Sequence, residues 1–202
     1  FRSHGDRGLG PVDMHRSIVK SSNVYYYSLA NEMGVDLMHE QLSPFMFGRK
    51  TGIDVDGEVT GVLPSTEWKR RYYKKPEQQK WYAGETISLG IGQGYNNFTM
   101  LQLASAAGTL VSGGQRFRPR LVREVEDVIS GQRQRLSSDA LEPLPLKPEH
   151  VALIRSAMPD RPPRRPNRLL WAGAVVGALF IAVFALAGWL RSRRVGLVHL
   201  HQ

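Results

Sequence analysis

The sequence predicts a mixed, helix-rich α/β domain in residues 1–158, followed by a single C-terminal transmembrane helix. Two observations carry this prediction. Hydrophobic residues make up 42% of the 202 residues and charged residues 22%, a composition typical of globular domains that argues against wholesale disorder. Residues 169–190 then form an uninterrupted apolar run. The chain is long enough for one good-sized domain with an appendage.

The N-terminal part predicts helices separated by short polar breaks. Residues 13–20 and 24–33 are helical stretches, and Gly34 is placed to end the second of them. A third helix is expected over residues 36–47, with Asp36 as its cap.

The middle of the domain predicts less regular structure. Residues 48–64 favour turns with short extended pieces, because five of them are glycine or proline. Ser65 is placed to cap a short helix. Residues 72–98 lack helical periodicity, so no helix is expected there.

The last third of the domain predicts two helices and one strand. Residues 99–112 form an apolar helix that Thr99 is placed to cap and two following glycines to end. Residues 121–129 predict a strand that leads into a Ser-Gly turn. Pro148 stands at the start of a helix that continues to Met158 and keeps its apolar residues on one face.

Residues 169–190 predict a membrane-spanning helix. These 22 residues would extend about 33 Å as a helix, which matches a hydrocarbon core of about 30 Å. Trp171 and Trp189 lie near the two ends, where amphipathic rings favour the interface. A buried core helix is the alternative, although such helices are seldom so long and so uniformly apolar. Residues 159–168 then form a basic linker rich in Pro and Arg, and residues 191–202 a basic tail, so the orientation in the membrane stays open.

Charge and composition exclude several classes of function. Residues 160–202 hold seven of the 27 basic and one of the 18 acidic residues, a net charge of +6, which leaves only +3 for residues 1–159. No nucleic-acid partner is therefore predicted. The absence of cysteine excludes disulfides and thiolate metal sites. The six histidines lack metal-ligand spacing, apart from an unconvincing pair at the C-terminus, so neither a metal nor a cofactor is predicted.

Four segments between residues 17 and 122 form the most informative pattern. They read SIVKSSNVYYYSLANEMG, GRKTGIDVDGE, GETISLGIGQGY and FTMLQLASAAGTLVSGGQRFRPRLV. In this order they closely resemble class B penicillin-binding proteins, and within that family most of all the penicillin-binding protein 2 group of peptidoglycan D,D-transpeptidases. The resemblance covers about residues 9–158. It implies an incomplete transpeptidase domain of the fold that penicillin-binding proteins share with serine β-lactamases.

The resemblance also implies serine acyl transfer at a site built from three motifs, S-x-x-K, S-x-N and K-[ST]-G. Ser21-Ser22-Asn23 matches the second motif. In the family, the hydroxyl corresponding to Ser21 relays a proton, and the amide corresponding to Asn23 hydrogen-bonds the substrate backbone and the motif lysine. Ser21 and Asn23 are therefore the candidate catalytic residues. The plainer alternative is that both merely cap the helix that begins at Val24.

Partners and location follow from the same resemblance. The implied ligands are peptidoglycan stem peptides that end in D-Ala-D-Ala and the β-lactams that mimic them. The implied surroundings are the bacterial inner membrane, with residues 1–158 facing the periplasm, and proteins of the cell-elongation machinery. The alternative function is a catalytically inactive, membrane-tethered module that keeps contacts with the cell wall or with partner proteins.

Two further matches are interpreted as unrelated to the reacting centre. Residues 17–20 spell S-x-x-K, but the family separates that motif widely from S-x-N. Residues 50–52 spell K-T-G but correspond to a separate family segment, K-T-G-I-D-x-x-G-E. The nucleophile is therefore expected before residue 1 and the true third motif beyond Met158, so this chain alone is expected to be inactive. A fusion, rearrangement or frameshift near residue 158 would each explain the membrane run, which departs from the family pattern.

Overall fold

The computed structural model describes residues 9–158. The helices in chain order are α1 (Met14–Val19), α2 (Asn23–Leu42), the 3-10 helix η1 (Ser43–Phe45), α3 (Thr66–Tyr72), α4 (Pro76–Gln79), α5 (Ala83–Leu89), α6 (Met100–Val111) and α7 (Pro148–Ala157). The strands are β1 (Arg116–Phe117), β2 (Glu124–Glu126), β3 (Arg133–Arg135) and β4 (Ala140–Leu141). The apolar run at residues 169–190 lies outside the described residues.

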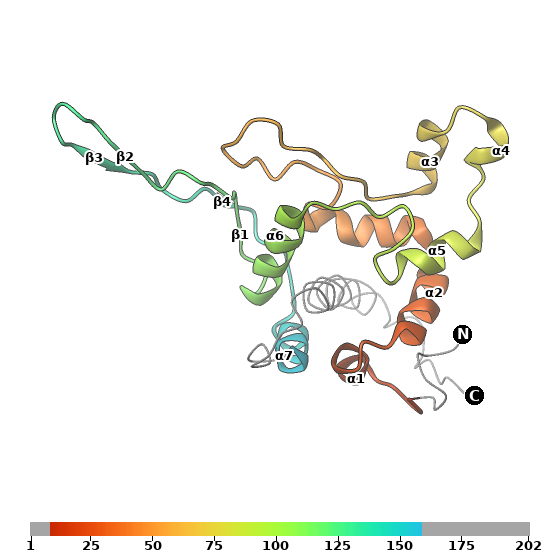
Figure 1. Cartoon of the computed structure of the whole chain (residues 1–202). Helices are drawn as coiled ribbons and strands as arrows, with labels where there is room; N and C mark the ends of the chain where they lie inside the picture. Colours follow the sequence, from red (N-terminus) through yellow and green to blue (C-terminus); the bar gives the residue numbers. More distant parts are fainter. Residues whose placement is uncertain (1–8, 159–202) are drawn as a thin grey trace, which may run out of the picture.

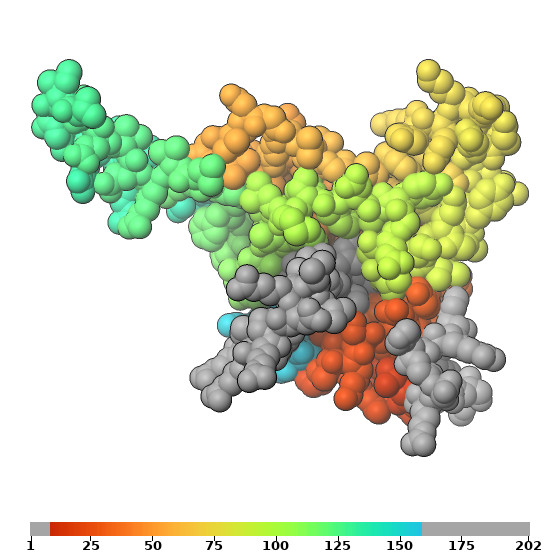
Figure 2. Space-filling model, in the orientation of Figure 1, coloured from red at the N-terminus to blue at the C-terminus, as the bar shows by residue number. Residues whose placement is uncertain are grey.

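The packed helices form one body, and two projections leave it on opposite sides. α1 packs against α7, α5 packs against α2, and α6 contacts η1, β1 and α7. Residues 65–82, which we call the α3–α4 lobe, form one projection, and the β2–β3 hairpin forms the other (Figures 1 and 2). The mixed helical and sheet content that the sequence predicts is therefore confirmed, with helices in the majority.

The core is built from side chains of α1, α2, α5, α6 and α7 and of the segment around η1. Its members are apolar side chains that the neighbouring helices shield from solvent, as the burial of apolar surface favours. The most completely buried are Tyr26, Ala30, Met38, Leu42, Phe47, Leu89, Ala106, Leu110 and Ile154.

Both described sheets are two-stranded and antiparallel, β1 with β4 and β2 with β3. The predicted strand over residues 121–129 is wrong in extent, because only Glu124–Glu126 pairs with another strand. The backbone N–H groups of Leu121 and Val122 donate instead to the Asp54 carboxylate, at 2.6 and 2.9 Å. A contact with a distant loop thus replaces the start of the strand.

Side-chain caps stand at the start of three helices, and the sequence predicts two of them, at Ser65 and Thr99. The Asp13 carboxylate accepts from Arg16 N–H at 2.7 Å before α1, and the Ser65 hydroxyl accepts from Trp68 N–H at 3.0 Å before α3. Thr99 and Gln102 form a reciprocal capping box at the start of α6. These interactions span only three residues, so the sequence alone specifies them.

The prediction for residues 36–47 is partly wrong. Gly34 does interrupt the helix, with φ 71° and ψ 161°, and divides α2 at a kink. Asp36 is not a cap, because its carboxylate accepts from the backbone N–H and the hydroxyl of Thr66, both at 2.8 Å. The helix also ends at Leu42 and continues only as the single turn of η1.

The expectation of no helix in residues 72–98 is wrong, since α4 and α5 both lie there. α5 is held by tertiary contacts more than by its own sequence. Its buried residues are Thr86 and Leu89, and the residue that follows, Gly90, lies against α2. A Cβ atom added at Gly90 would come within 2.6 Å of both the Ala30 Cβ and the Tyr26 carbonyl oxygen.

We therefore expect Gly90→Ala to lower the free energy of unfolding by about 1–3 kcal/mol, because the added methyl group overpacks the α2–α5 contact. Gly84→Ala is the matched control, since the same substitution within α5 meets no atom within 4 Å. That control should be neutral or stabilising by up to about 1 kcal/mol, the helix preference for alanine over glycine. Urea unfolding followed by tryptophan fluorescence measures both, and equal stability of the two variants would contradict the close approach.

Candidate active site

The turn between α1 and α2 carries Ser21-Ser22-Asn23. It closes the C-terminus of α1 with two backbone hydrogen bonds, from Ser21 N–H to the Ile18 carbonyl at 3.2 Å and from Ser22 N–H to the Ser17 carbonyl at 2.9 Å. These two bonds define a Schellman motif, whose central residue adopts a left-handed conformation. Here the central residue is Ser21, with φ of 49°.

A serine at this position is locally unfavourable. Glycine is the usual residue there, because a side chain in the left-handed region costs about 1–2 kcal/mol. Among residues 9–158, Ser21 and Met46 are the two residues other than glycine with a positive φ. Backbone strain of this kind is characteristic of functional positions, where the side chain matters more than the local conformational cost.

Ser21 and Asn23 are exposed, whereas Ser22 between them is buried, with 4% of its surface accessible. The turn therefore presents the first and third residues of the motif to solvent and directs the second inward. Within the described part of the chain, neither the Ser21 hydroxyl nor the Asn23 side chain makes a hydrogen bond. The two polar groups remain available to a ligand.

The helix-capping alternative for Ser21 and Asn23 is wrong. The N-cap residue of α2 is Ser22, Asn23 is already the first helical residue, and no side chain makes a capping hydrogen bond at this end. The polar character of this turn is thus not explained by the needs of the helix.

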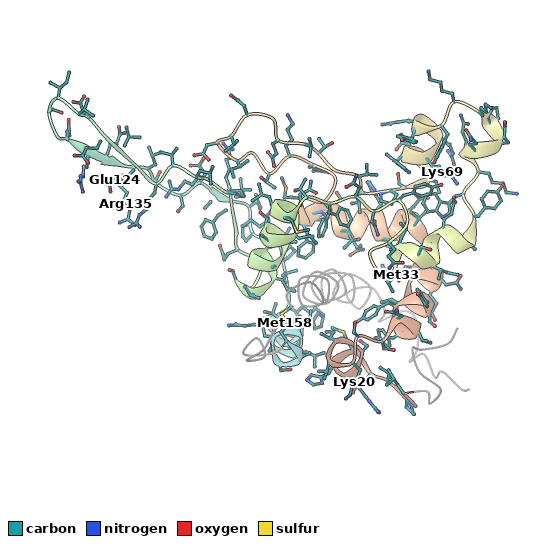
Figure 3. All side chains as sticks on the ribbon, viewed as in Figure 1. Lys20, Met33, Lys69, Glu124, Arg135 and Met158 are labelled. Carbon is teal, nitrogen blue, oxygen red and sulfur yellow. The ribbon has the colours of Figure 1, made fainter. Side chains whose placement is uncertain are left out.

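Ser17 is buried and hydrogen-bonded within the domain, which agrees with the interpretation that its S-x-x-K match is coincidental. The side chain has 0% exposure, and its hydroxyl lies 2.7 Å from the Met14 carbonyl oxygen and 2.7 Å from the Tyr26 hydroxyl. A nucleophile must reach its substrate, and this hydroxyl does not. Lys20 is exposed at the end of α1, beside the turn (Figure 3).

Residues 50–52 belong to a loop rather than to a strand. The Glu58 carboxylate accepts from the backbone N–H and hydroxyl of Thr51, at 2.6 and 2.7 Å, and from Gly52 N–H at 3.0 Å. Desolvation raises the pKa of Glu58, but these hydrogen bonds outweigh it, so the net pKa lies below its usual value. The K-T-G sequence at residues 50–52 therefore serves a loop that hydrogen bonds to Glu58 close.

The structure contains a second polar centre that sequence reasoning does not predict, the partly buried ion pair of Lys69 and Glu85. Lys69 is 3% exposed, its Nζ lies 2.5 Å from Glu85 Oε1, and it also donates to the Lys80 carbonyl at 2.8 Å. The rings of Trp81, Tyr82 and Tyr95 surround the ammonium group at 5.4–5.5 Å. The available signal was the density of Lys, Trp and Tyr in residues 68–95, which helical periodicity does not detect.

This second centre stands apart from the candidate site. Figure 3 places Lys69 at the α3–α4 lobe and Lys20 at the opposite end of the view, beside the α1–α2 turn. Lys69 is fully engaged by its carboxylate, its carbonyl and its aromatic neighbours, so the pair stabilises the lobe rather than serving the turn.

Two further properties concern the described residues only. In residues 9–158 no group of three or more His, Cys, Asp or Glu side chains is arranged to hold a metal ion. Over the same residues, none of the helices combines the length and the hydropathy needed to cross a bilayer.

The family match and the similar curated proteins both name transpeptidases. Residues 1–162 match the family described as the penicillin binding protein transpeptidase domain. Peptidoglycan D,D-transpeptidase MrdA of Acinetobacter baumannii is 43% identical over 123 residues, which are 61% of this chain and 18% of that protein. The MrdA protein of Haemophilus influenzae is 39% identical over 129 residues, 64% of this chain and 19% of that protein.

Solved structures agree with these relatives. Pseudomonas aeruginosa PBP2 in complex with WCK 5153 is 37% identical, with a TM-score of 0.58 over 71% of this chain and 31% of that one. The complex between PBP2 and MreC from Helicobacter pylori gives 25% identity and a TM-score of 0.60 over 78% of this chain and 27% of that one. The chain spans about a fifth of the length of the curated relatives it matches. Since the family match covers most of its residues, the chain belongs to the penicillin-binding protein transpeptidase domain family.

Proposed function

We propose that residues 9–158 supply the second active-site motif, Ser21 and Asn23, of a peptidoglycan D,D-transpeptidase that acts in cell-wall elongation. The observation that carries the proposal is the α1–α2 turn. Its serine is exposed and held in a left-handed conformation that local preferences oppose, while the neighbouring asparagine is exposed and makes no hydrogen bond within the described residues. The relatives named D,D-transpeptidase support the reaction class.

The proposed chemistry is acyl transfer from serine. The nucleophilic serine, expected from a segment outside these 202 residues, adds to the carbonyl carbon between the two terminal D-Ala residues. The peptide bond breaks, and the last D-Ala leaves with a proton on its amine. An amine of a neighbouring stem peptide then displaces the serine oxygen, so that a new amide bond forms and the hydroxyl is restored. β-Lactams acylate the same serine and leave it blocked.

In this reaction Ser21 relays the proton, and Asn23 orients the acyl group. A hydroxyl both donates and accepts, so Ser21 can pass a proton between the motif lysine and the departing amine without changing charge. The Asn23 amide can donate to the substrate backbone and accept from that lysine at the same time. Because the nucleophile is expected elsewhere, the 202 residues alone should carry no transpeptidase activity.

The remaining assignments extend the same proposal. Residues 1–158 are the partial transpeptidase domain facing the periplasm, residues 159–168 a linker, 169–190 an inner-membrane span and 191–202 a basic tail. Elongation proteins are the proposed partners, in keeping with the PBP2–MreC complex among the structural relatives. The alternative, an inactive membrane-tethered module, differs by forming no acyl adduct with penicillin in the complete protein.

The test is the acylation rate of the full-length protein that carries this segment. Asn23→Ala should slow labelling by a fluorescent penicillin about 10²-fold, the effect of removing one hydrogen-bond donor that acts on the transition state. Asn31→Ala is the matched control, since Asn31 is also exposed on α2 but lies two turns beyond the motif. If both variants acylate at the parental rate while remaining folded, the catalytic assignment of Asn23 is wrong.

A further inference from the structure

We infer that Ser17 and Tyr26 are positioning residues that hold the Ser21–Asn23 turn in its reactive geometry. This inference rests on the proposed function of that turn. The two residues lie on either side of it, Ser17 on α1 and Tyr26 on α2, and both side chains have 0% exposure. Their hydroxyl oxygens are 2.7 Å apart, so one hydrogen bond closes the segment that contains the motif.

The direction of this bond follows from the number of hydrogens. The Ser17 hydroxyl has one hydrogen and lies 2.7 Å from the Met14 carbonyl oxygen, which can only accept. Ser17 therefore donates to Met14, and the Tyr26 hydroxyl donates to Ser17. The resulting chain runs from α2, through the Ser17 hydroxyl, to the first residue of α1. Hydrogen bonds in such a chain strengthen one another when they are shielded from water.

Ser17 holds the turn in a second way. Its backbone carbonyl accepts from Ser22 N–H at 2.9 Å, the bond that gives Ser21 its left-handed conformation. One residue thus fixes both the backbone of the turn and the start of the following helix. A strained serine persists only where its surroundings determine its conformation. The two hydrogen bonds of Ser17, through its hydroxyl to Tyr26 and through its carbonyl to Ser22 N–H, provide such surroundings for Ser21.

Tyr26 is held from the opposite side. Its carbonyl oxygen faces Gly90 at a separation that leaves no room for a Cβ atom, so the C-terminal end of α5 packs directly against the Tyr26 backbone in α2. Its ring also meets the Tyr25 ring edge-on, with centroids 5.1 Å apart. Asn23 lies one turn of helix before Tyr26, so a shift of Tyr26 displaces Asn23 as well. Reactivity is sensitive to such shifts, since a displacement of about 1 Å can reduce a rate about 10²-fold.

The experiment compares Tyr26→Phe and Ser17→Ala in the full-length protein. We expect each to slow acylation by fluorescent penicillin at least about tenfold, while the labelled fraction at saturation stays unchanged. A merely structural role would instead lower the labelled fraction and leave the rate of the folded molecules unaltered. Thr86→Val is the matched control, because it also removes a buried hydroxyl, the acceptor for Trp81 Nε1–H at 2.8 Å, and should acylate at the parental rate.

Amide hydrogen exchange provides a readout that does not depend on activity. The Ser22 amide should exchange severalfold faster in Tyr26→Phe than in the parent or in Thr86→Val. Its acceptor is the Ser17 carbonyl, and Ser17 loses its hydrogen bond to the Tyr26 hydroxyl in this variant. Parental acylation and exchange in Tyr26→Phe would overturn the inference, even where Asn23→Ala is slow. If Asn23→Ala is itself not slowed, the proposed function fails, and the exchange of the Ser22 amide then decides whether Tyr26 restrains the turn.

Discussion

Replacing Ser21 with glycine is expected to stabilise the protein and, in the same variant, to slow its acylation. Ser21 occupies the left-handed position of the Schellman motif, with φ of 49°. Glycine would remove about 1–2 kcal/mol of strain and lose about 0.5–1 kcal/mol to the greater freedom of the unfolded chain. The free energy of unfolding should therefore rise, by up to about 1.5 kcal/mol. Loss of the proton relay should reduce the acylation rate roughly 10²–10⁴-fold.

Ser21→Ala separates these two effects. It removes the same hydroxyl but keeps a Cβ atom in the left-handed conformation, so its stability should stay close to that of the parent while acylation falls as in the glycine variant. Urea unfolding and the labelling rate by fluorescent penicillin, both measured on the full-length protein, give the comparison. A glycine variant that is stabilised yet acylates at the parental rate would show that Ser21 only terminates α1.

Lys69→Met is expected to lower the free energy of unfolding by about 1.5–3 kcal/mol, because it breaks a partly buried, charge-assisted hydrogen bond and leaves the Glu85 carboxylate without its cationic partner. The Glu85 side chain is only 23% exposed, and Lys69 is its cationic neighbour at 2.5 Å. The Tyr82 N–H and Tyr95 hydroxyl donors, at 2.9 and 3.0 Å, remain but carry no full charge. Lys74→Met, which changes an exposed lysine of the same lobe, should alter stability by no more than about 0.5 kcal/mol.

The effect of Lys69→Met should also depend on pH. Desolvation raises the pKa of Glu85, but hydrogen bonds from Lys69, Tyr82 N–H and Tyr95 outweigh it, so the folded-state pKa lies below the ordinary 4.5. A carboxylate with a depressed pKa stabilises the fold above 4.5, and this contribution is lost as the pH falls through the folded-state value. Urea unfolding at neutral pH and well below pH 4.5 should therefore show a smaller difference between parent and variant in acid. A difference that does not change with pH would contradict the ion pair.

The sequence was sufficient for features that depend on neighbours within a few residues. The sequence predicts the caps at Ser65 and Thr99, because a side chain and the backbone N–H that it binds lie three residues apart. Gly34 was predicted to interrupt its helix for a similarly local reason. The candidate motif, Ser21 to Asn23, was also identified from sequence, through the order of four segments that resemble the family.

Contacts between distant residues had to be supplied by the tertiary structure. α5 approaches α2 closely at Gly90 and binds Lys69 through Glu85, and neither contact leaves a helical period in the sequence. The residues around Asp36 predict that it caps a helix. In the structure its carboxylate instead accepts hydrogen bonds from Thr66, thirty residues later.

The same division applies to the candidate site. Sequence identified Ser21 and Asn23, whereas only the structure shows that Ser21 is strained, that both residues face solvent and that Ser17 is buried against Tyr26. The physical reason is that capping and turn preferences arise between groups a few bonds apart. Burial and charge pairing depend on which segments meet when the chain folds, and those contacts lie far apart in the sequence.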